Sequence, residues 1–478
     1  MQNDITIIGG GFCGTAVLLQ LVEKATEKGS ILHIVWLNKG YPLAQGIAFS
    51  TFDATHLLNV PVGRMSVFAD RPNHFLDWLQ SQKNITIPAH IQANLATAFV
   101  PRQWYGAYLA ATVNTVVSRL SPNIKINVME AEAVDMEYFK YKKNVQISLA
   151  NGDIIITKKV VLALGNQLPQ QPTFLTEKVA ASSLYRANPW NETAVNNLQK
   201  SDKTVFLFGT SLTMIDAVVS LTRLGFEGKI VALSTRGYLP LPHRQFAADT
   251  KILQDIDFQE DMPKLYGIFK RHIRRVHTES NSGLAVVDAV RPLTQKIWID
   301  LQIAEKQRFM RHVRHLWGVA RHRIPQEVSQ FLTQLKAAQK FEILSGRVQT
   351  VAEAPDGLHI TYRVRGTDAQ QTIIAQRMIN CTGPLTDIAQ SKMPLLQNML
   401  AKKYIASCAM RLGIDAQPNG VVLNSDAKPQ TWLLAVGSLL KGVLWESTAV
   451  PELRTQAQEI AELIVNELIV VKCVGKSY

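Results

Sequence analysis

Apolar residues occur in short runs along this chain, and several of the runs end directly at a glycine. The first run covers residues 4–8 and is followed by the hexapeptide GGGFCG at residues 9–14. Residues 16–22 then show the apolar spacing of a helix, and residues 31–37 form a second apolar run. This order predicts a buried strand, a tight glycine turn, a helix and a second strand.

The glycine turn has the spacing G-x-G-x-x-G, with Phe12 and Cys13 between its last two glycines. Gly9 allows a sharp turn, Gly11 lets a ligand approach the backbone, and Gly14 lets the helix lie close to the strand. The helix N-terminus would then point at the phosphates of a dinucleotide. An ordinary glycine turn is the competing interpretation, but the position between a strand and a helix favours a dinucleotide site.

The second predicted strand ends at Asn38, where dinucleotide-binding proteins usually carry an acid that holds the ribose hydroxyls. An amide can accept a hydrogen bond, but it lacks the charge that would strengthen it. We therefore expect a dinucleotide site with an unusual ribose contact, which the exchange Asn38→Glu would tighten.

The same order of elements returns later in the chain. Residues 204–208 form an apolar run, Gly209 begins a turn, residues 215–224 have helical spacing, and a further strand is expected over residues 229–234. A helical stretch of about residues 245–340 follows this second unit.

Each unit is completed by a meander and by a strand that runs into a glycine. In the first unit, an Asn-Gly turn joins the predicted strands 144–149 and 154–156, and the next apolar run ends at Gly165. In the second unit, a similar pair of strands precedes a run that ends at Gly383. The repetition is one of pattern, because the two sequences are dissimilar.

These patterns predict the α/β fold class, with two Rossmann-like dinucleotide-binding domains. The first domain is expected to be discontinuous, with residues 1–170 and 375–478. The second is expected as an inserted domain of residues 200–374, which includes the helical insertion at about 245–340. An amphipathic helix from about residue 450 to residue 470 should close the chain.

A chain of 478 residues is long enough for two or three domains, and 47% hydrophobic with 19% charged residues is typical of a globular protein. No apolar run is long enough to span a bilayer, and the N-terminal residues do not resemble a signal peptide. The four cysteines have no C-x-x-C spacing, which argues against a dithiol reductase and a structural metal site. We expect a cytoplasmic protein with no bound metal.

The net charge of +13 is concentrated in residues 270–323, where 12 Lys and Arg residues face four acidic ones. This region is either an anion-binding site or a solvated helical face, and the sequence leaves both open. No nucleic-acid-binding motif accompanies the charge, so nucleic acid is not expected as a partner.

Longer motifs are similar to those of a family of largely uncharacterised bacterial FAD/NAD(P)-binding proteins. These proteins are related to the N-hydroxylating and other class B flavin monooxygenases. The similar segments run through nearly the whole chain, and they are specific for the family rather than for one reaction. They are GIAFS at 46–50, HLLNVP at 56–61, GRM at 63–65, HFLDWL at 74–79, PRQWYGAYL at 101–109, residues 209–216, residues 317–325 and WESTAVPE at 445–452.

The resemblance implies that FAD occupies the first domain, with its pyrophosphate on the glycine loop. It also implies that the tail motif from Gly437 brings a helix N-terminus to the flavin ring, where the positive end of the helix dipole stabilises reduced, anionic flavin. Asn38 stands in place of the family's usual Glu. The implied FAD-binding residues are Gly9, Gly11, Phe12, Cys13, Gly14, Asn38, Asn59, Val60, Arg64, Met65, Arg102, Gly165, Gly383, Gly437, Gly442 and Glu446.

The second glycine loop departs from the G-x-G-x-x-G spacing, because Ser211 and Met214 replace its second and third glycines. The strand that follows ends at Arg236 without an acid, and a basic end favours the 2′-phosphate of NADPH over NADH. The alternative is a domain that keeps the fold without binding a nicotinamide. The candidate NADPH-binding residues are Gly209, Thr210, Ser211, Leu212, Thr213 and Arg236.

The favoured function is therefore that of an FAD-dependent oxidoreductase, specifically an NADPH-dependent monooxygenase that hydroxylates a small molecule. One alternative is a flavin reductase or dehydrogenase without oxygen insertion. Another is a non-catalytic flavin-binding protein with a degenerate nicotinamide site. His243 and Glu446 are the candidate acid–base groups. The patterns identify neither the substrate nor the oligomeric state.

Overall fold

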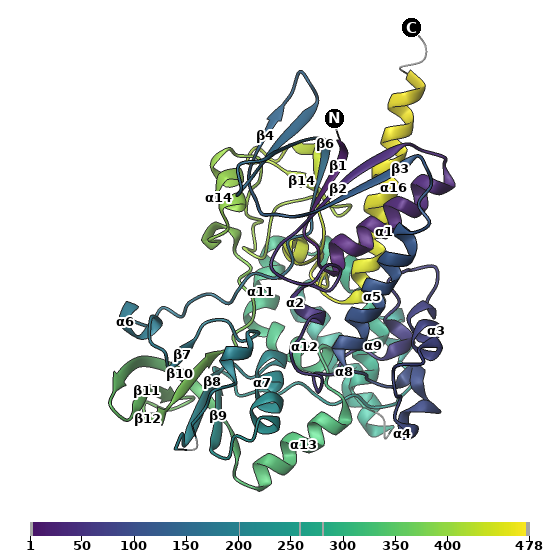
Figure 1. The fold of residues 1–478 in the computed structure, drawn as a ribbon. Coiled ribbons are helices and arrows are strands. Elements are labelled where there is room, and N and C mark those ends of the chain that lie inside the picture. The colour runs from purple at the N-terminus through teal and green to yellow at the C-terminus, as the bar shows by residue number, and fades with distance from the viewer. Residues whose placement is uncertain (1–2, 200, 258–259, 280–281, 475–478) are drawn as a thin grey trace.

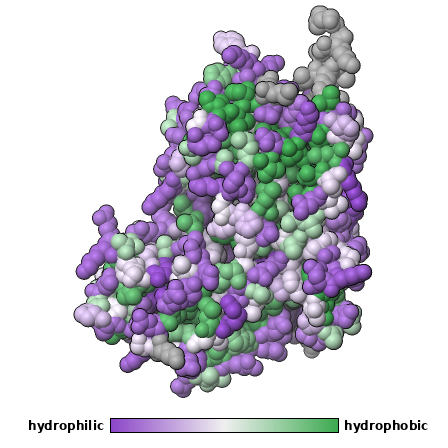
Figure 2. All heavy atoms as spheres, in the orientation of Figure 1, coloured by the Kyte–Doolittle hydropathy of each residue, from purple (hydrophilic) through white to green (hydrophobic). Residues whose placement is uncertain are grey.

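The structure is a computed structural model that describes residues 3–199, 201–257, 260–279 and 282–474. It contains two β-sheets, each with helices around it, and a group of helices below the first sheet and beside the second (Figure 1). Within the described residues, no helix is both long enough and apolar enough to cross a bilayer. Figure 2 shows a mostly polar face, with apolar residues gathered at upper right, where Figure 1 places α1, α5 and α16.

The central strands of the first sheet are parallel, and they include the two strands of the predicted glycine-loop unit. Ile7 of the first strand pairs with Trp36 on one side and with Val161 on the other. The β4–β5 hairpin extends the sheet beyond β6. In spatial order the strands are β14 (Val421–Leu423), β15 (Pro429–Ala435), β6 (Ile154–Leu162), β1 (Asn3–Ile8), β2 (Leu32–Asn38) and β3 (Ile124–Glu130), with β5 (Asn144–Leu149) on β6 and β4 (Ala133–Phe139) on β5.

Apolar residues cover both faces of this sheet, which explains its nearly continuous apolar strands. One face packs against α1 (Phe12–Glu27), α5 (Arg102–Val117) and α16 (Val450–Val474), and their side chains form one buried cluster. The other face carries α14 (Pro394–Ala401), which contacts β4. The predicted closing helix is thus present, and it lies against the first helix of the chain (Figure 1).

The second sheet repeats the strand–glycine–helix–strand order. The strands β8 (Thr204–Phe208) and β9 (Lys229–Ser234) precede and follow α7 (Leu212–Arg223) in the chain and pair in parallel. Helix α13 (Gln326–Ala337) packs on the same core as α7. In spatial order the strands are β12 (Gln370–Ala375), β11 (Gly357–Val364), β10 (Phe341–Ala354), β9 (Lys229–Ser234), β8 (Thr204–Phe208), β13 (Arg377–Asn380) and β7 (Tyr185–Arg186).

One predicted domain boundary needs correction. The sequence pattern assigned everything from residue 375 to the first domain, but β13 pairs in parallel with β8, so Arg377–Asn380 belongs to the second sheet. The reason is that a buried strand ending in glycine fits either sheet, and only the pairing partner decides between them. The edge strands β3 and β4, which have many exposed positions, were not predicted.

The predicted helical insertion is present between β9 and β10. Its helices pack on one another through the clusters around Trp298 and Val286. They are α8 (Met262–Thr278), α9 (Leu284–Val290), α10 (Thr294–Asp300), α11 (Ile303–His312) and α12 (Arg314–Arg321). The remaining α-helices of the described chain are α2 (Gly46–Phe49), α3 (His74–Ser81), α4 (Ala89–Gln92), α6 (Glu177–Ala180) and α15 (Lys441–Leu444).

Charged side chains clamp the first domain onto α7 of the second. Arg102 donates two hydrogen bonds to Asp216, at 2.7 and 3.1 Å. Asp53 is fully buried and accepts hydrogen bonds from Ser220 at 2.6 Å and from Arg223 at 2.9 Å. Burial alone would raise the pKa of Asp53, but these and neighbouring hydrogen bonds hold that pKa well below its usual range. The clamp therefore fixes the two sheets relative to each other.

Candidate functional site

The glycine loop after β1 has the geometry that its spacing predicts. Gly9 has φ +124°, and a Cβ there would lie 2.2 Å from the carbonyl oxygen of Ala163. A Cβ on Gly14 would lie 1.9 Å from the carbonyl oxygen of Gly9, so the helix approaches the strand at this glycine. Gly11 precedes α1, whose first turn has no side-chain cap and no acidic residue. The N–H groups of that turn are therefore available to an anionic ligand.

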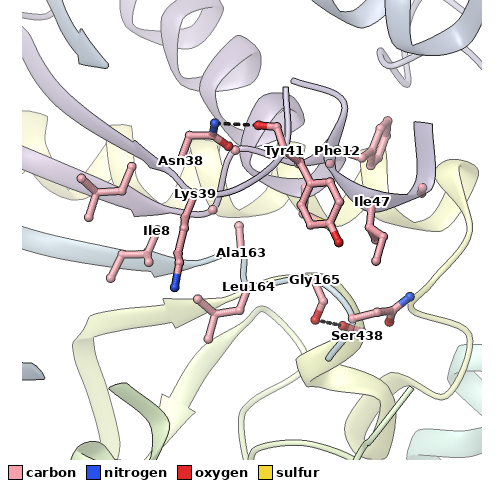
Figure 3. A pocket seen from close by; sticks show the side chains of 18 of the residues that line it. Ile8, Phe12, Asn38, Lys39, Tyr41, Ile47, Ala163, Leu164, Gly165 and Ser438 are labelled. Atoms are coloured by element: carbon pink, nitrogen blue, oxygen red, sulfur yellow. Dashed lines mark hydrogen bonds between the residues drawn. The ribbon is translucent and has the colours of Figure 1, made fainter. Parts of the chain in front are cut away.

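A cavity of about 370 Å³ opens directly at this loop (Figure 3). The glycine loop, including Phe12 and Cys13, forms one wall, and the segment after β6 forms another. Gly165 lies in that segment with φ +68°, and its carbonyl oxygen accepts a hydrogen bond of 2.7 Å from Ser438. Burial raises the pKa of the Cys13 thiol to about 12, so this cysteine stays protonated at neutral pH.

Asn38 lines the same cavity, but its amide already has partners in the protein. Its Nδ2 group donates to the carbonyl oxygen of Tyr41 and to Glu130 Oε2, each at 2.9 Å (Figure 3 shows the first bond). Its Oδ1 atom lies so close to Gly10 that a Cβ there would come within 2.1 Å of it. The donor group of Asn38 thus ties it to Tyr41 and Glu130 while its oxygen lies against the glycine loop, a role that the sequence pattern did not indicate.

A second cavity, of about 750 Å³, adjoins the first, and both are lined by Ile47, Ala48, Phe49, Asn166, Thr448 and Val450. Its walls come from both domains and from the helical insertion. The predicted residues Asn59, Val60, Arg64, Met65 and Arg102 line it from the first domain. Leu212 and Thr213 line it from the start of α7, and His243 lines it from the segment after β9. The two cavities together give a long site that runs from the glycine loop to α7.

His243 is held in one orientation inside the larger cavity. Its Nε2 atom lies 3.0 Å from the carbonyl oxygen of Asn59, and a carbonyl can only accept, so Nε2 carries the proton. Phe99 packs against the ring, with 4.7 Å between the ring centroids. Burial lowers the pKa of His243, so the ring is neutral at pH 7 and its Nδ1 atom is a proton acceptor.

Glu446 lies behind the wall of the larger cavity, not in its lining. The Trp317 indole donates a 2.8 Å hydrogen bond to its carboxylate, and Arg321 lies 3.4 Å away. Burial would raise the pKa of Glu446, but Arg321, His322 and this hydrogen bond together lower it. Trp445 precedes it with φ +56°, a strained value for a bulky residue. Glu446 is therefore an ionised, buried carboxylate that positions the wall of the cavity.

Three features of the site fit an FAD molecule. The α1 N-terminus points into a cavity bounded by glycines, as a pyrophosphate requires. Ser447 lines the smaller cavity, and its buried Oγ atom has no hydrogen-bond partner among the described residues. Val450, the first residue of α16, and Thr448 just before the helix border both cavities. A polar ligand that spans both cavities would engage these groups.

The second glycine loop resembles the first in its backbone. Gly209 has φ +124°, and a Cβ there would lie 2.4 Å from the carbonyl oxygen of Cys381. Ser211 precedes α7, and its side chain makes no cap hydrogen bond to the helix, so the hydroxyl is not used for capping. Thr210 contacts Ser234 at 2.9 Å and donates to the carbonyl oxygen of Tyr238 at 2.7 Å, so it holds the loop in place instead of facing a ligand.

A cationic cluster surrounds the end of β9. Burial lowers the pKa of Arg314, and the nearby positive charge of Arg236 lowers it further. Burial also lowers the pKa of His315, and the positive charges of Arg314 and Arg236 lower it further. None of the ion pairs found within the described residues joins Arg236 or Arg314 to a carboxylate. Arg314 was not predicted individually, because its place beside Arg236 depends on how the helical insertion folds back.

Three glycines that were predicted to bind FAD line neither of the two cavities. Gly383 follows β13 in the second sheet, next to the second glycine loop, and so lies on the nicotinamide side. Gly437 and Gly442 serve packing, since a Cβ on either would lie 2.6 Å or less from a sulfur, that of Cys13 or Cys408. Neither lines either cavity.

Three basic residues of the region 270–323 are paired with acids inside the protein, while others on its helices are exposed. Arg323 pairs with Asp288 at 2.7 Å, and Arg291 and Arg321 pair with Glu452 at 3.1 and 3.2 Å. These three arginines also line the larger cavity. The region is therefore neither a continuous basic patch nor a simple solvated face. The sequence reading also missed Glu132, which lines the smaller cavity beside Lys39 and follows the unpredicted strand β3.

Comparisons with known proteins agree with this geometry. Residues 6–167 match the family model described as FAD-NAD(P)-binding. No curated protein matches the chain in sequence. Among solved structures, the chain is similar to the reduced form of ornithine hydroxylase from Pseudomonas aeruginosa, with a TM-score of 0.66, 13% identity, and coverage of 98% of this chain and 100% of that one.

Two further structures have the same overall fold. L-lysine 6-monooxygenase from Pseudomonas syringae has a TM-score of 0.65 and 13% identity, over 97% of this chain and 99% of that one. Bacillithiol disulfide reductase from Staphylococcus aureus has a TM-score of 0.52 and 12% identity, over 98% and 99%. The predicted fold class is confirmed: the chain contains an FAD/NAD(P)-binding domain and has the fold of the flavoproteins with two dinucleotide-binding domains.

Proposed function

We propose that this protein is an FAD-dependent monooxygenase that takes electrons from NADPH and hydroxylates a small molecule. The observation that carries the proposal is the larger cavity, which borders the start of α16, the start of α7 and the helical insertion at once. A flavin, a nicotinamide and a substrate can meet in such a space. Two of the similar structures, those of ornithine hydroxylase and lysine 6-monooxygenase, carry names that describe the same class of reaction.

In this proposal, each part of the chain has a separate task. The α1 N-terminus and the glycine loop bind the FAD pyrophosphate, and the Thr448–Val450 segment places the positive end of α16 at the ring. Bound FAD would supply the electron transfer from nicotinamide to oxygen. His243 accepts a proton at Nδ1 inside the cavity. The helical insertion covers one side of the cavity and limits its contact with bulk water.

The cationic cluster at the end of β9 supports NADPH as the reductant. Arg236 and Arg314 come from different elements and meet without a carboxylate, which suits the additional phosphate on the NADPH ribose. Exchange of both for serine should raise the KM for NADPH by at least tenfold and leave the KM for NADH nearly unchanged. An equal loss with both nucleotides would contradict this assignment.

The substrate we propose is a small molecule with a carboxylate or phosphate group. Arg64 and Arg244 line the larger cavity, and within the described chain neither has an ion pair with an acid. The two aspartates of the lining, Asp216 and Asp288, are paired with Arg102 and Arg323. The charged side chains that line the cavity without an ion-pair partner among the described residues are thus positive.

The deciding experiment measures the flavin and then its reaction. The purified protein should be yellow, NADPH should bleach it without oxygen, and air should restore the colour with formation of a hydroxylated product from a panel of small acids. Gly11→Val should abolish FAD binding, because it puts a branched side chain on the loop that lines the smaller cavity, while a Cβ there makes only an ordinary contact of 3.6 Å with Gly46 Cα. Gly318→Ala is the matched control, because a Cβ there has no neighbour within 4 Å.

The alternative function is that of a reductase that passes hydride to an organic acceptor. The disulfide reductase among the similar structures shows that this fold serves such chemistry too. Rapid oxidation of NADPH with a quinone or similar acceptor, without any hydroxylated product in air, would favour this alternative. A colourless protein that binds no FAD would contradict both enzymatic functions. The free cysteines Cys13, Cys381 and Cys408 fit our further proposal of a cytoplasmic location.

A further inference from the structure

The helical insertion encloses a third cavity that has no part in the function proposed above. Its volume is about 510 Å³, within the range of small-molecule sites. Helices α8 to α12 all contribute to its wall, and Trp445 closes one end. Apart from Thr294 and the residues on one side of α8, the lining is apolar or aromatic. A cavity of this composition favours an elongated apolar ligand.

The inner end of the cavity is built from aromatic rings. Trp298 stacks on Trp445 with 4.9 Å between the ring centroids, and the Phe309 ring lies 5.7 Å from Trp298 and 5.1 Å from Trp445. Met262 and Leu265, at the start of α8, belong to the same cluster. This end is buried and apolar, so it suits the terminal carbons of an acyl chain.

The outer end carries two positive charges. Lys270 and Arg274 lie one turn apart on α8, line the cavity and are exposed at its rim. No ion pair joins either of them to an acid within the described chain, whereas their neighbours Arg271 and Arg275 lie near Asp255 and Asp249. From Leu265 to Arg274, nine helical residues span about 13 Å, roughly the length of a ten-carbon chain.

The apolar cavity is separate from the larger cavity of the flavin site. Helices α9 and α12 form the partition between them. Val287 and Val290 of α9 face the apolar cavity, while the intervening Asp288 and the following Arg291 face the larger one. On α12, Trp317 and Ala320 line the apolar cavity and Arg321 lines the other. A ligand of the apolar cavity therefore does not need to be the substrate.

We propose that this cavity binds a single-chain amphiphile with an anionic head group, such as a medium-chain carboxylate. The chain lies among the rings of Trp298, Phe309 and Trp445, and the carboxylate lies at Lys270 and Arg274. Charge complementarity at the rim and apolar burial within are the two sources of affinity.

The test measures binding of dodecanoate to the FAD-loaded protein by calorimetry, below the concentration at which it forms micelles. One molecule should bind per chain. From hexanoate to decanoate, each added methylene should tighten binding about fourfold, and the gain should stop once the cavity is full. A dodecanoate brominated near its methyl end should quench tryptophan fluorescence, because three tryptophans, Trp298, Trp317 and Trp445, line the cavity.

Variants separate the head site from the chain site. The double exchange Lys270→Gln with Arg274→Gln should weaken dodecanoate about fivefold and leave dodecanol unaffected. Lys264→Gln with Arg271→Gln removes the same charge from the same helix, outside the cavity, and should change nothing. Leu316→Trp should block the cavity; Leu316 lines it and is 43% exposed, so the larger ring can be tolerated.

Several results would overturn the proposal. Absence of binding, equal loss in both double variants, or a lack of chain-length dependence would each do so. Binding to anionic phospholipid vesicles without binding of monomeric dodecanoate would replace the cavity with a membrane-contacting surface. None of these results would affect the proposed monooxygenase activity, because the partition of α9 and α12 keeps the two sites apart.

Discussion

An acid at position 38 should weaken FAD binding, which reverses the expectation from the sequence pattern. The informative exchange is Asn38→Asp, because it keeps the size of the side chain. It replaces a donor that bonds Tyr41 O and Glu130 Oε2, each at 2.9 Å, with an oxygen that can only accept. The longer side chain of Asn38→Glu would in addition press against Gly10, which Asn38 already contacts closely.

The magnitude follows from the distance between the two carboxylates. Two negative charges about 3 Å apart repel by about 1.4 kcal/mol in bulk water and by about 5 kcal/mol at the effective dielectric of a protein surface. Glu130 is exposed, so the lower half of this range applies. The lost hydrogen bond to Tyr41 adds about 1 kcal/mol. We expect FAD to bind at least tenfold more weakly at pH 8.

The assay is a titration of the FAD-free protein with FAD, followed by flavin fluorescence. Adding Glu130→Gln to the Asn38→Asp variant should restore binding, because an amide at position 130 can then donate the hydrogen bond to the carboxylate at position 38. Lowering the pH should also restore part of the binding in the single variant, since protonation removes one charge. Tighter FAD binding by Asn38→Asp alone would refute the reasoning and return position 38 to a ribose-binding role.

Three further predictions concern the clamp, the cavity histidine and the buried carboxylate. Asp216→Asn should lower the free energy of unfolding by about 1–3 kcal/mol in a denaturant titration, because it breaks the two-bond pair with the partly buried Arg102, and an unchanged midpoint would contradict the clamp. Burial lowers the pKa of His243, so the folded state favours the neutral ring and wild-type stability should fall as the pH drops below about 6.5, where only the unfolded chain gains the proton. His243→Gln should flatten that slope in thermal melts, and an unchanged slope would exclude His243 as its source. Trp317→Phe should cost about 1.5–3 kcal/mol of stability, because it removes the hydrogen bond to the buried, charged Glu446, and the loss should shrink to about 1 kcal/mol in a Glu446→Gln background, where the acceptor is neutral.

Local patterns predicted most elements of the fold, because both glycine turns are short-range features. Gly9 and Gly209 adopt the same positive φ of 124°, as repeated strand–glycine–helix units require. Local patterns could not decide which strands pair with each other. The strand before Gly383 could pair in either sheet, and only its register with β8 places it in the second.

The same limit explains the site. The residues of the glycine loop in the first cavity were predicted, whereas Glu130 reaches Asn38 through the pairing of β2 with β3, and Glu132, which lines the cavity, follows that pairing. Arg102 was predicted to support FAD; it lines the larger cavity, but its guanidinium group is bound to Asp216 of the other domain. Arg102 and Asp216 lie 114 positions apart in the sequence, so a pattern read over neighbouring residues cannot predict their contact.

The clamp on α7 has a consequence for how the enzyme would cycle. A flavoprotein with loosely joined halves can turn one half to present different surfaces to the flavin in alternate steps. Here the buried Asp53 and the Arg102–Asp216 pair hold α7 by hydrogen bonds from two separate segments of the first domain. Such a body cannot turn without breaking both sets of bonds. Reduction of the flavin and the later reaction with oxygen would then take place in one fixed arrangement of the two domains, so the ligands have to move in and out of the site while the domains stay in place.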